Sequence, residues 1–178
     1  MLTVKQQGVL GGMVTGLVAT VLALALAILV HPAALTPSSG FPETLAHALK
    51  WDVLLVICLA VNIGLLARHR FFTPDDIDGG GLTRGTSQAQ VLQSTLQNTL
   101  EQAVLGLAVH IIWAALMPQA WQAAVPVAAM LFFGGRVLFW RGYARGAPAR
   151  ALGFALTFYP SVAMLLIILG RLIWSLFS

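Results

Sequence analysis

Residues 8–30, GVLGGMVTGLVATVLALALAILV, form a continuous apolar stretch that contains no charged side chain. A helix of about 20 apolar residues crosses the hydrocarbon core of a bilayer, and this stretch is long enough to do so. Inside a bilayer, backbone polar groups must pair within the protein, so only helices and closed β-barrels cross it. The chain lacks the alternating apolar and polar pattern of barrel strands. Residues 8–30 therefore predict a transmembrane helix.

Four more apolar segments follow along the 178-residue chain. Hydrophobic residues make up 58% of the sequence and charged residues 9%, and the mean hydropathy is +0.86. Soluble domains do not have this composition. We therefore expect an all-α integral membrane protein with five transmembrane helices. The four further segments are residues 51–66, 103–117, 123–139 and 151–177.

The distribution of lysine and arginine predicts the orientation of the chain. Cytoplasmic loops of membrane proteins carry an excess of these residues. The predicted outside loops, residues 31–50 and 118–121, contain Lys50 alone, whereas the other side carries seven basic residues. We therefore expect a cytoplasmic amino terminus, an outside carboxyl terminus and insertion in the cell (inner) membrane. The seven basic residues are Lys5, Arg68, Arg70, Arg84, Arg141, Arg145 and Arg150.

The loop after the second segment contains Asp75, Asp76 and Asp78, followed by three glycines. A calcium loop needs alternating ligands and a closing glutamate, which this spacing lacks. We therefore expect a flexible acidic connector and no metal site. Thr86 or Ser87 can cap the next helix.

Three glycines in the first segment, Gly8, Gly12 and Gly16, are four residues apart. Glycines at this spacing let two helix backbones approach closely in a membrane. The pattern favours a specific packing seam over generic glycine content.

Two groups of polar residues lie at the edges of apolar segments. Ser94, Gln97 or Asn98, and Glu101 fall on one face of the third helix. A carboxylate at this depth must be paired, which makes it a functional candidate, although polar side chains that only join helices are the alternative.

The second group follows the fourth segment. Arg136, Phe139 or Trp140, and Tyr143 share one helix face. Pro148 favours the start of a new helix. Arg150 then falls in the first turn, where the helix amino terminus and a guanidinium together favour an anion. Arginines near the turn can be explained by their role in setting the orientation of the chain in the membrane. That role does not explain Arg136, which lies farther inside the apolar segment.

Taken together, Asn98-x-x-Glu101 and Arg136-x-x-Phe139-x-x-x-Tyr143-x-Arg145-x-x-x-x-Arg150 resemble the MAPEG family, the membrane-associated proteins in eicosanoid and glutathione metabolism. The resemblance covers roughly residues 51–178 and implies a four-helix core. It also implies a homotrimer that binds glutathione between protomers near the cytoplasmic face. Residues 1–50 are then an additional amino-terminal transmembrane helix with its outside loop.

The resemblance also implies roles for individual residues. Arg150 corresponds to the catalytic arginine that activates the thiol of glutathione. A guanidinium favours the thiolate, which is the nucleophile, and arginines can clamp the carboxylates of glutathione. Arg68 corresponds to a basic residue at the end of the first core helix, with Arg70 as the other choice. The implied glutathione-binding residues are Asn98, Glu101, Arg136, Tyr143, Arg145 and Arg68, with Arg141 as a replacement cation.

Three positions depart from the family's transferases, which usually carry an arginine at position 94, an aromatic residue at 102 and a tyrosine at 139. This chain has Ser94, Gln102 and Phe139, and each change removes a polar, cationic or aromatic contact. The leading hypothesis is a glutathione-dependent, or similar thiol-dependent, membrane transferase or peroxidase that acts on apolar electrophiles or lipid peroxides. The alternatives are a non-enzymatic protein that binds lipid or presents a partner, and a purely structural membrane subunit. We expect membrane lipids and an apolar small molecule as partners, and no nucleic acid.

Overall fold

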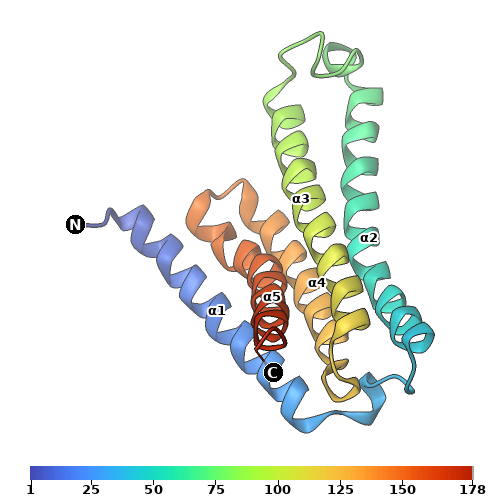
Figure 1. Cartoon of the computed structure of the whole chain (residues 1–178). Helices are drawn as coiled ribbons and strands as arrows, with labels where there is room; N and C mark the ends of the chain where they lie inside the picture. Colours follow the sequence, from blue (N-terminus) through green and yellow to red (C-terminus); the bar gives the residue numbers. More distant parts are fainter. Residues whose placement is uncertain (178) are drawn as a thin grey trace.

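The computed structural model describes residues 1–177. Within this range the chain forms five long helices, each long and apolar enough to cross a membrane (Figure 1). The predicted all-α membrane fold is confirmed. The helices are α1 (Val4–Val30), α2 (Phe41–Phe72), α3 (Ser87–Leu116), α4 (Ala124–Tyr143) and α5 (Ala147–Trp174), and the short 3₁₀ helices are η1 (Ala33–Leu35), η2 (Pro74–Asp76) and η3 (Gln119–Trp121).

Local sequence signals account for the helix ends. The side chain of Thr3 accepts a hydrogen bond from the backbone N–H of Gln6, whose side chain accepts one from the backbone of Thr3, which is a capping box. Thr86 caps α3 by accepting from the backbone of Ala89. Gly146 has a φ of +96° and precedes Pro148 in the first turn of α5, as the sequence predicts.

The start of α2 differs from the prediction. The apolar pattern begins near Trp51, but the helix begins at Phe41, so the connection predicted over residues 31–50 is shorter. Gly40, with a φ of +127°, and Pro42 together permit the early start. The added turns are held in place because the Thr44 hydroxyl donates to the backbone oxygen of Ala114 on α3 across 3.1 Å.

Successive helices alternate in direction, and α2 and α3 extend well beyond the turn between α4 and α5 (Figure 1). The extension contains the polar first third of α3, which the sequence places outside the hydrocarbon. The amino terminus, the α2–α3 loop and the α4–α5 turn lie toward one end of the bundle, and the carboxyl terminus lies toward the other.

The predicted glycine seam of α1 is present, and the structure shows that its partner is α5. A Cβ on Gly8 would lie 2.9 Å from the side chain of Pro148, and one on Gly12 would lie 2.8 Å from that of Ala151. Gly16 lies in the same way against Ala155. Contacts this close exclude any larger side chain, so the glycines fix where α1 lies.

The backbones of α4 and α5 also approach closely. A Cβ on Gly135 would lie 2.8 Å from the backbone oxygen of Gly153, and Gly142 lies against the backbone of Ala149. This contact brings the carboxyl-terminal end of α4 beside the first turns of α5. The aromatic residues of α4 thereby meet Arg150.

Candidate functional site

A cavity of about 550 Å³ lies among α3, α4 and α5. Four of the residues predicted for the site line it, namely Asn98, Glu101, Tyr143 and Arg150. The other lining residues are Gln93, Ser94, Gln97, Phe139 and Phe154.

The contribution of α3 is one polar helix face. Gln97 and Asn98 follow Ser94 by three and four residues, and Glu101 follows them by four and three, so the predicted helix face is present and both of its alternative middle residues line the cavity. Gln97 donates through Nε2 to Oε1 of Glu101 across 2.9 Å. Glu101 is exposed, so its carboxylate remains accessible to a ligand.

Arg136 lies behind this face and is fully buried, with 0% of its surface exposed. Its Nη1 donates to Oδ1 of Asn98 across 2.9 Å, and its Nη2 donates to Oγ1 of Thr157 on α5 across 2.6 Å. Its guanidinium carbon also lies 4.4 Å from the centre of the Phe139 ring. Among the described residues, Arg136 has no carboxylate within salt-bridge distance, and its Nε has no hydrogen-bond partner. Arg136 therefore holds Asn98 in place and does not itself line the cavity.

Arg150 is half-buried and lies over an aromatic ring. Its guanidinium carbon is 4.2 Å from the centre of the Tyr143 ring, which is cation–π geometry. The Tyr143 ring in turn contacts Phe139, with 5.4 Å between ring centres. These contacts hold a cation in the cavity at the first turn of α5, where the helix dipole adds to its positive potential.

Arg141 and Arg145 do not line the cavity. Both are exposed, and Arg145 donates through Nε and Nη2 to the backbone oxygen of Arg141. The Arg145 side chain thus caps the carboxyl-terminal end of α4.

The two arginines at the end of α2 point to different sides. Arg68 lines a separate cavity of about 310 Å³ with Leu65, Phe72 and Leu92. Arg70 instead donates to Oε1 of Gln93 across 3.1 Å. It also lines a cavity of about 340 Å³ that shares Gln93 and Ser94 with the candidate site. Within the single chain, Arg70 is therefore the α2 cation on the side of the candidate site.

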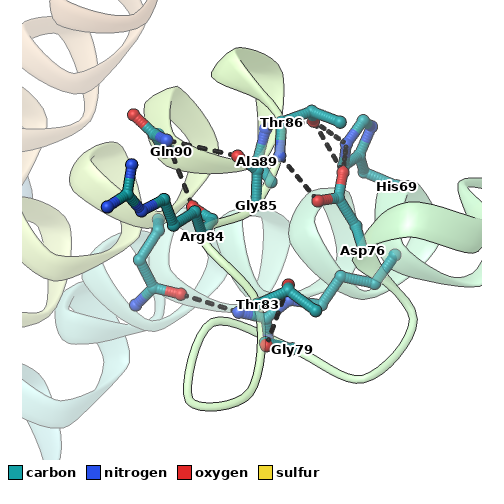
Figure 2. A network of polar contacts seen from close by, with 11 residues as sticks. His69, Asp76, Gly79, Thr83, Arg84, Gly85, Thr86, Ala89 and Gln90 are labelled. Carbon is teal, nitrogen blue, oxygen red and sulfur yellow. Dashed lines mark hydrogen bonds and ion pairs between the residues drawn. The ribbon is translucent and has the colours of Figure 1, made fainter.

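The acidic loop is anchored by one of its aspartates (Figure 2). The predicted flexible acidic connector is wrong for Asp76, which is buried and accepts hydrogen bonds from the backbone and hydroxyl of Thr86 at 2.7 and 2.6 Å. Nε2 of His69 lies 2.8 Å from the same carboxylate. The Thr86 hydrogen bonds, with His69 adding to them, hold the pKa of Asp76 below its ordinary value. Asp76 thus ties the end of α2 to the start of α3.

Several residues near the site were missed by the sequence reasoning. Gln93 and Phe154 line the cavity, and Thr99 and Thr157 accept hydrogen bonds from Arg136. A threonine in an apolar segment is a weak signal, because threonine also bonds to its own helix.

A second buried polar contact lies outside the site. Nδ1 of His110 on α3 is 2.5 Å from Oδ1 of Asp52 on α2, and the two side chains are each 2% exposed. Each is a lone ionisable residue in an apolar segment, and that signal was present in the sequence.

The helices and the cavity define an integral membrane protein with a polar, charged cavity among its last three helices. A protein-family model, the MAPEG family, matches residues 45–170. The chain therefore belongs to the MAPEG family, whose members are membrane proteins associated with glutathione and eicosanoid metabolism. The match begins within α2 and leaves α1 outside it, so α1 is an additional amino-terminal helix. Comparisons with curated proteins and with solved structures gave no match.

Proposed function

We propose that this protein is a glutathione-dependent, or similar thiol-dependent, membrane transferase or peroxidase that acts on apolar electrophiles or lipid peroxides. The observation that carries the proposal is the presence of Glu101 and Arg150, with Asn98, around one cavity of about 550 Å³. Family membership supports the same class of co-substrate.

The cavity complements glutathione in charge. Glutathione has two carboxylates, one ammonium group and a thiol. Glu101 can accept the ammonium, and the amide of Asn98, held by Arg136, can donate to a carboxylate. Arg70 lies in the adjoining cavity and supplies a further cation for a carboxylate.

Arg150 acts on the sulfur in this proposal. A cation beside a thiol favours the charged form and lowers the thiol pKa. In conjugation, the thiolate forms a C–S bond with the electrophilic carbon, and the displaced electron pair leaves with the leaving group or moves along the π system. In peroxide reduction, the thiolate takes the terminal oxygen of a hydroperoxide, which releases an alcohol and gives a sulfenic acid. A second glutathione then converts this to the disulfide and water.

The assembly and orientation belong to the same proposal. We propose a homotrimer in the inner membrane, with the site on the cytoplasmic side, since MAPEG proteins are generally trimers. In such a trimer, the outward-facing Arg68 is available to a neighbouring protomer's site.

A second candidate function is lipid binding or partner presentation without catalysis. The specific observation in its favour is that Arg150 is the one cation among the residues that line the cavity. Ser94 stands where transferases of the family usually carry an arginine. The two functions differ in whether a bound thiol is ionised.

The test is an ultraviolet titration of thiolate absorbance against pH with saturating glutathione. Wild type is expected to lower the thiol pKa of bound glutathione, and Arg150→Ala is expected to return it toward the free value while much of the binding remains. Glu101→Gln is expected to weaken binding with little change in the thiol pKa. Arg171→Ala is the matched control, since Arg171 is an exposed arginine near the far end of the same helix.

A wild-type thiol pKa equal to that of free glutathione, or no binding at millimolar concentration, overturns the enzyme proposal. The lipid-binding function then leads.

A further inference from the structure

The added helix α1 lines a groove beside its glycine seam. Lys5, Val9 and Met13 are four residues apart on α1, and Val9 and Met13 each follow a seam glycine by one residue. With Ala147, the first residue of α5, they line a cavity of about 440 Å³. We call this cavity the α1–α5 groove, because the seam holds the two helices together beside it. Its other lining residues are Leu2, Thr3, Gln6 and Leu10.

The groove is charged at one end and apolar along the rest of α1. Lys5 is exposed and lies in the first turn of α1, before the predicted span of residues 8–30. Met13 follows Lys5 by eight residues, which corresponds to about 12 Å along the helix axis. Val9 is half-buried, and Met13 and Leu10 are 40% and 47% exposed. The groove thus offers a cation at the end of an apolar path, which suits an amphipathic molecule with a polar head.

A second cavity widens the apolar part of the groove. It has a volume of about 260 Å³ and shares Val9, Met13 and Ala147 with the first cavity. From there it continues between α1 and α5 as far as Arg150 and Phe154. Two adjoining apolar cavities have room for two hydrocarbon chains, which favours a diacyl lipid over a molecule with one chain.

The charges around the groove favour an anionic headgroup. All six acidic residues of the chain lie in α2, in α3 or in the loop between them, and α1, α4 and α5 contain none. The end of the bundle that holds the amino terminus and the α4–α5 turn carries Lys5, Arg141 and Arg145 (Figure 1). A zwitterionic headgroup would bring its own cation among these residues, with no carboxylate on α1, α4 or α5 to receive it. Basic pockets between transmembrane helices bind anionic headgroups.

The amino terminus of α5 adds a second group that attracts a phosphate. No side chain caps this terminus, whereas Thr3 and Gln6 cap the start of α1. The first N–H groups of a helix lack partners within the helix, and its dipole is positive at this end. Ala147 lines the groove together with Lys5, so the positive end of α5 and the ammonium group lie beside the same cavity.

We propose that the α1–α5 groove binds one anionic phospholipid of the bilayer. Its phosphate lies at Lys5 and the amino terminus of α5, and its acyl chains lie along Val9 and Met13. The lipid fills the space beside the glycine seam and thereby holds α1 against the core. Lys5, Val9 and Met13 do not line the polar cavity, so this site is independent of the proposed thiol chemistry. Because the family match begins at residue 45, the site belongs to the added helix.

Native mass spectrometry of the full-length protein, released from detergent, tests the headgroup. The probes are dioleoyl phosphatidylglycerol, which is anionic, and dioleoyl phosphatidylcholine, which has the same chains and is zwitterionic. Wild type is expected to retain phosphatidylglycerol more strongly. Lys5→Gln is expected to weaken this retention about fivefold, which corresponds to about 1 kcal/mol for one lysine near an anionic headgroup. Retention of phosphatidylcholine is expected to stay unchanged.

Lys50→Gln is the matched control for the charge. Lys50 is the other lysine of the chain, is exposed on α2, and lies outside the lining of both cavities. This variant is expected to retain phosphatidylglycerol as wild type does. Equal retention of the two lipids by wild type, or an equal loss in the two lysine variants, overturns the proposal.

The groove itself is tested by Met13→Trp, whose larger side chain fills the apolar path. It is expected to weaken retention of both lipids severalfold. Val14→Trp is the control, since Val14 is the next residue on α1, is 52% exposed and lines neither cavity. The melting temperature of each variant without lipid checks that it is folded. Equal retention of phosphatidylglycerol by the two tryptophan variants overturns the groove.

Oleate distinguishes a phospholipid from a free fatty acid. It carries one of the same chains and a carboxylate, so it fills only part of the two cavities and is expected to bind more weakly than phosphatidylglycerol. Tighter binding of oleate, weakened by Lys5→Gln, would assign the groove to a fatty acid and overturn the phospholipid. None of these outcomes bears on the thiol pKa of bound glutathione, so the proposed function is tested separately.

Discussion

The buried guanidinium of Arg136 donates a hydrogen bond to the side-chain oxygen of Asn98 across 2.9 Å. A charge with 0% exposure and no carboxylate within salt-bridge distance among the described residues is costly to bury. Arg136 lies behind Asn98 at the back of the candidate site, and we expect an anion bound in the cavity to offset part of this cost. Stability and ligand binding should therefore respond differently when Arg136 is replaced.

Arg136→Met is expected to leave the melting temperature of the ligand-free protein unchanged or to raise it. Replacing a buried ionic group with an apolar one is often neutral or stabilising by about 1–4 kcal/mol. The stabilisation that glutathione gives to wild type is expected to vanish, because Asn98 loses its support. Thermal unfolding in detergent, with and without glutathione, measures both effects, and the exposed Arg141→Met is the control. A large fall in ligand-free stability would mean that the hydrogen bonds of Arg136 outweigh its desolvation.

Gly12→Leu is expected to destabilise the protein by about 1–3 kcal/mol, because the new side chain meets Ala151 and the backbone of Leu152. Gly11→Leu is the matched control, since a Cβ at Gly11 has no neighbour within 4 Å among the described atoms. The melting temperature should fall by several degrees for Gly12→Leu and stay near the wild-type value for Gly11→Leu. Equal melting temperatures would show that α1 does not use this seam.

Asp76→Asn is expected to loosen the α2–α3 loop at neutral pH, because Asp76 accepts two hydrogen bonds from Thr86. Since folding lowers the pKa of Asp76, its contribution to stability is fully present above the ordinary carboxyl value of about 3.9. The contribution is lost as pH falls through the lowered pKa. The protection of the amides of residues 73–86 from hydrogen exchange, relative to an unstructured chain at the same pH, should fall in wild type as the pH drops below about 4. It should already be low in Asp76→Asn at neutral pH. The exposed Asp75→Asn is the control, and protection lost equally in both variants would contradict the anchor.

Removing one partner of the buried Asp52–His110 contact is expected to cost about 3–5 kcal/mol, because the other polar group stays buried without a partner. The double variant Asp52→Leu with His110→Leu should regain much of this loss. Thermal unfolding of the two single variants and the double variant forms a mutant cycle. Strict additivity of the two losses would show that the contact contributes no coupling.

Cysteines introduced at Ser39 and Ser87, each in a Cys58→Ala background, are expected to react from opposite sides of the membrane. The lysine and arginine asymmetry predicts that Ser87 lies in the cytoplasm and Ser39 outside. An impermeant thiol reagent added to intact cells should label the cysteine at position 39 and spare the one at position 87. Labelling of position 87 from outside would reverse the orientation and the side of the site.

Much of the fold could be predicted from the sequence, because a bilayer leaves few alternatives. The apolar segments predict the five helices, and Gly146 with Pro148 predicts the break before Arg150. The start of α2 was missed, because the polar residues before Trp51 do not show an apolar helical pattern, whereas a contact with α3 helps to hold these turns in the helix. The local sequence pattern around Thr44 cannot predict its hydrogen bond with Ala114, because the two residues are far apart in the sequence.

The candidate site divides in the same way. Helical spacing by itself determined that Ser94, Asn98 and Glu101 share a face, since neighbours on one helix are fixed by 3.6 residues per turn. Only the tertiary structure decided that Arg136 lies behind Asn98, that Arg145 stays outside the cavity, and that α1 supplies an apolar wall beside Arg150. Those outcomes depend on the close approach of helix backbones at glycines. The approach depends on the shapes of both helix surfaces in contact, so the sequence of one helix does not determine it.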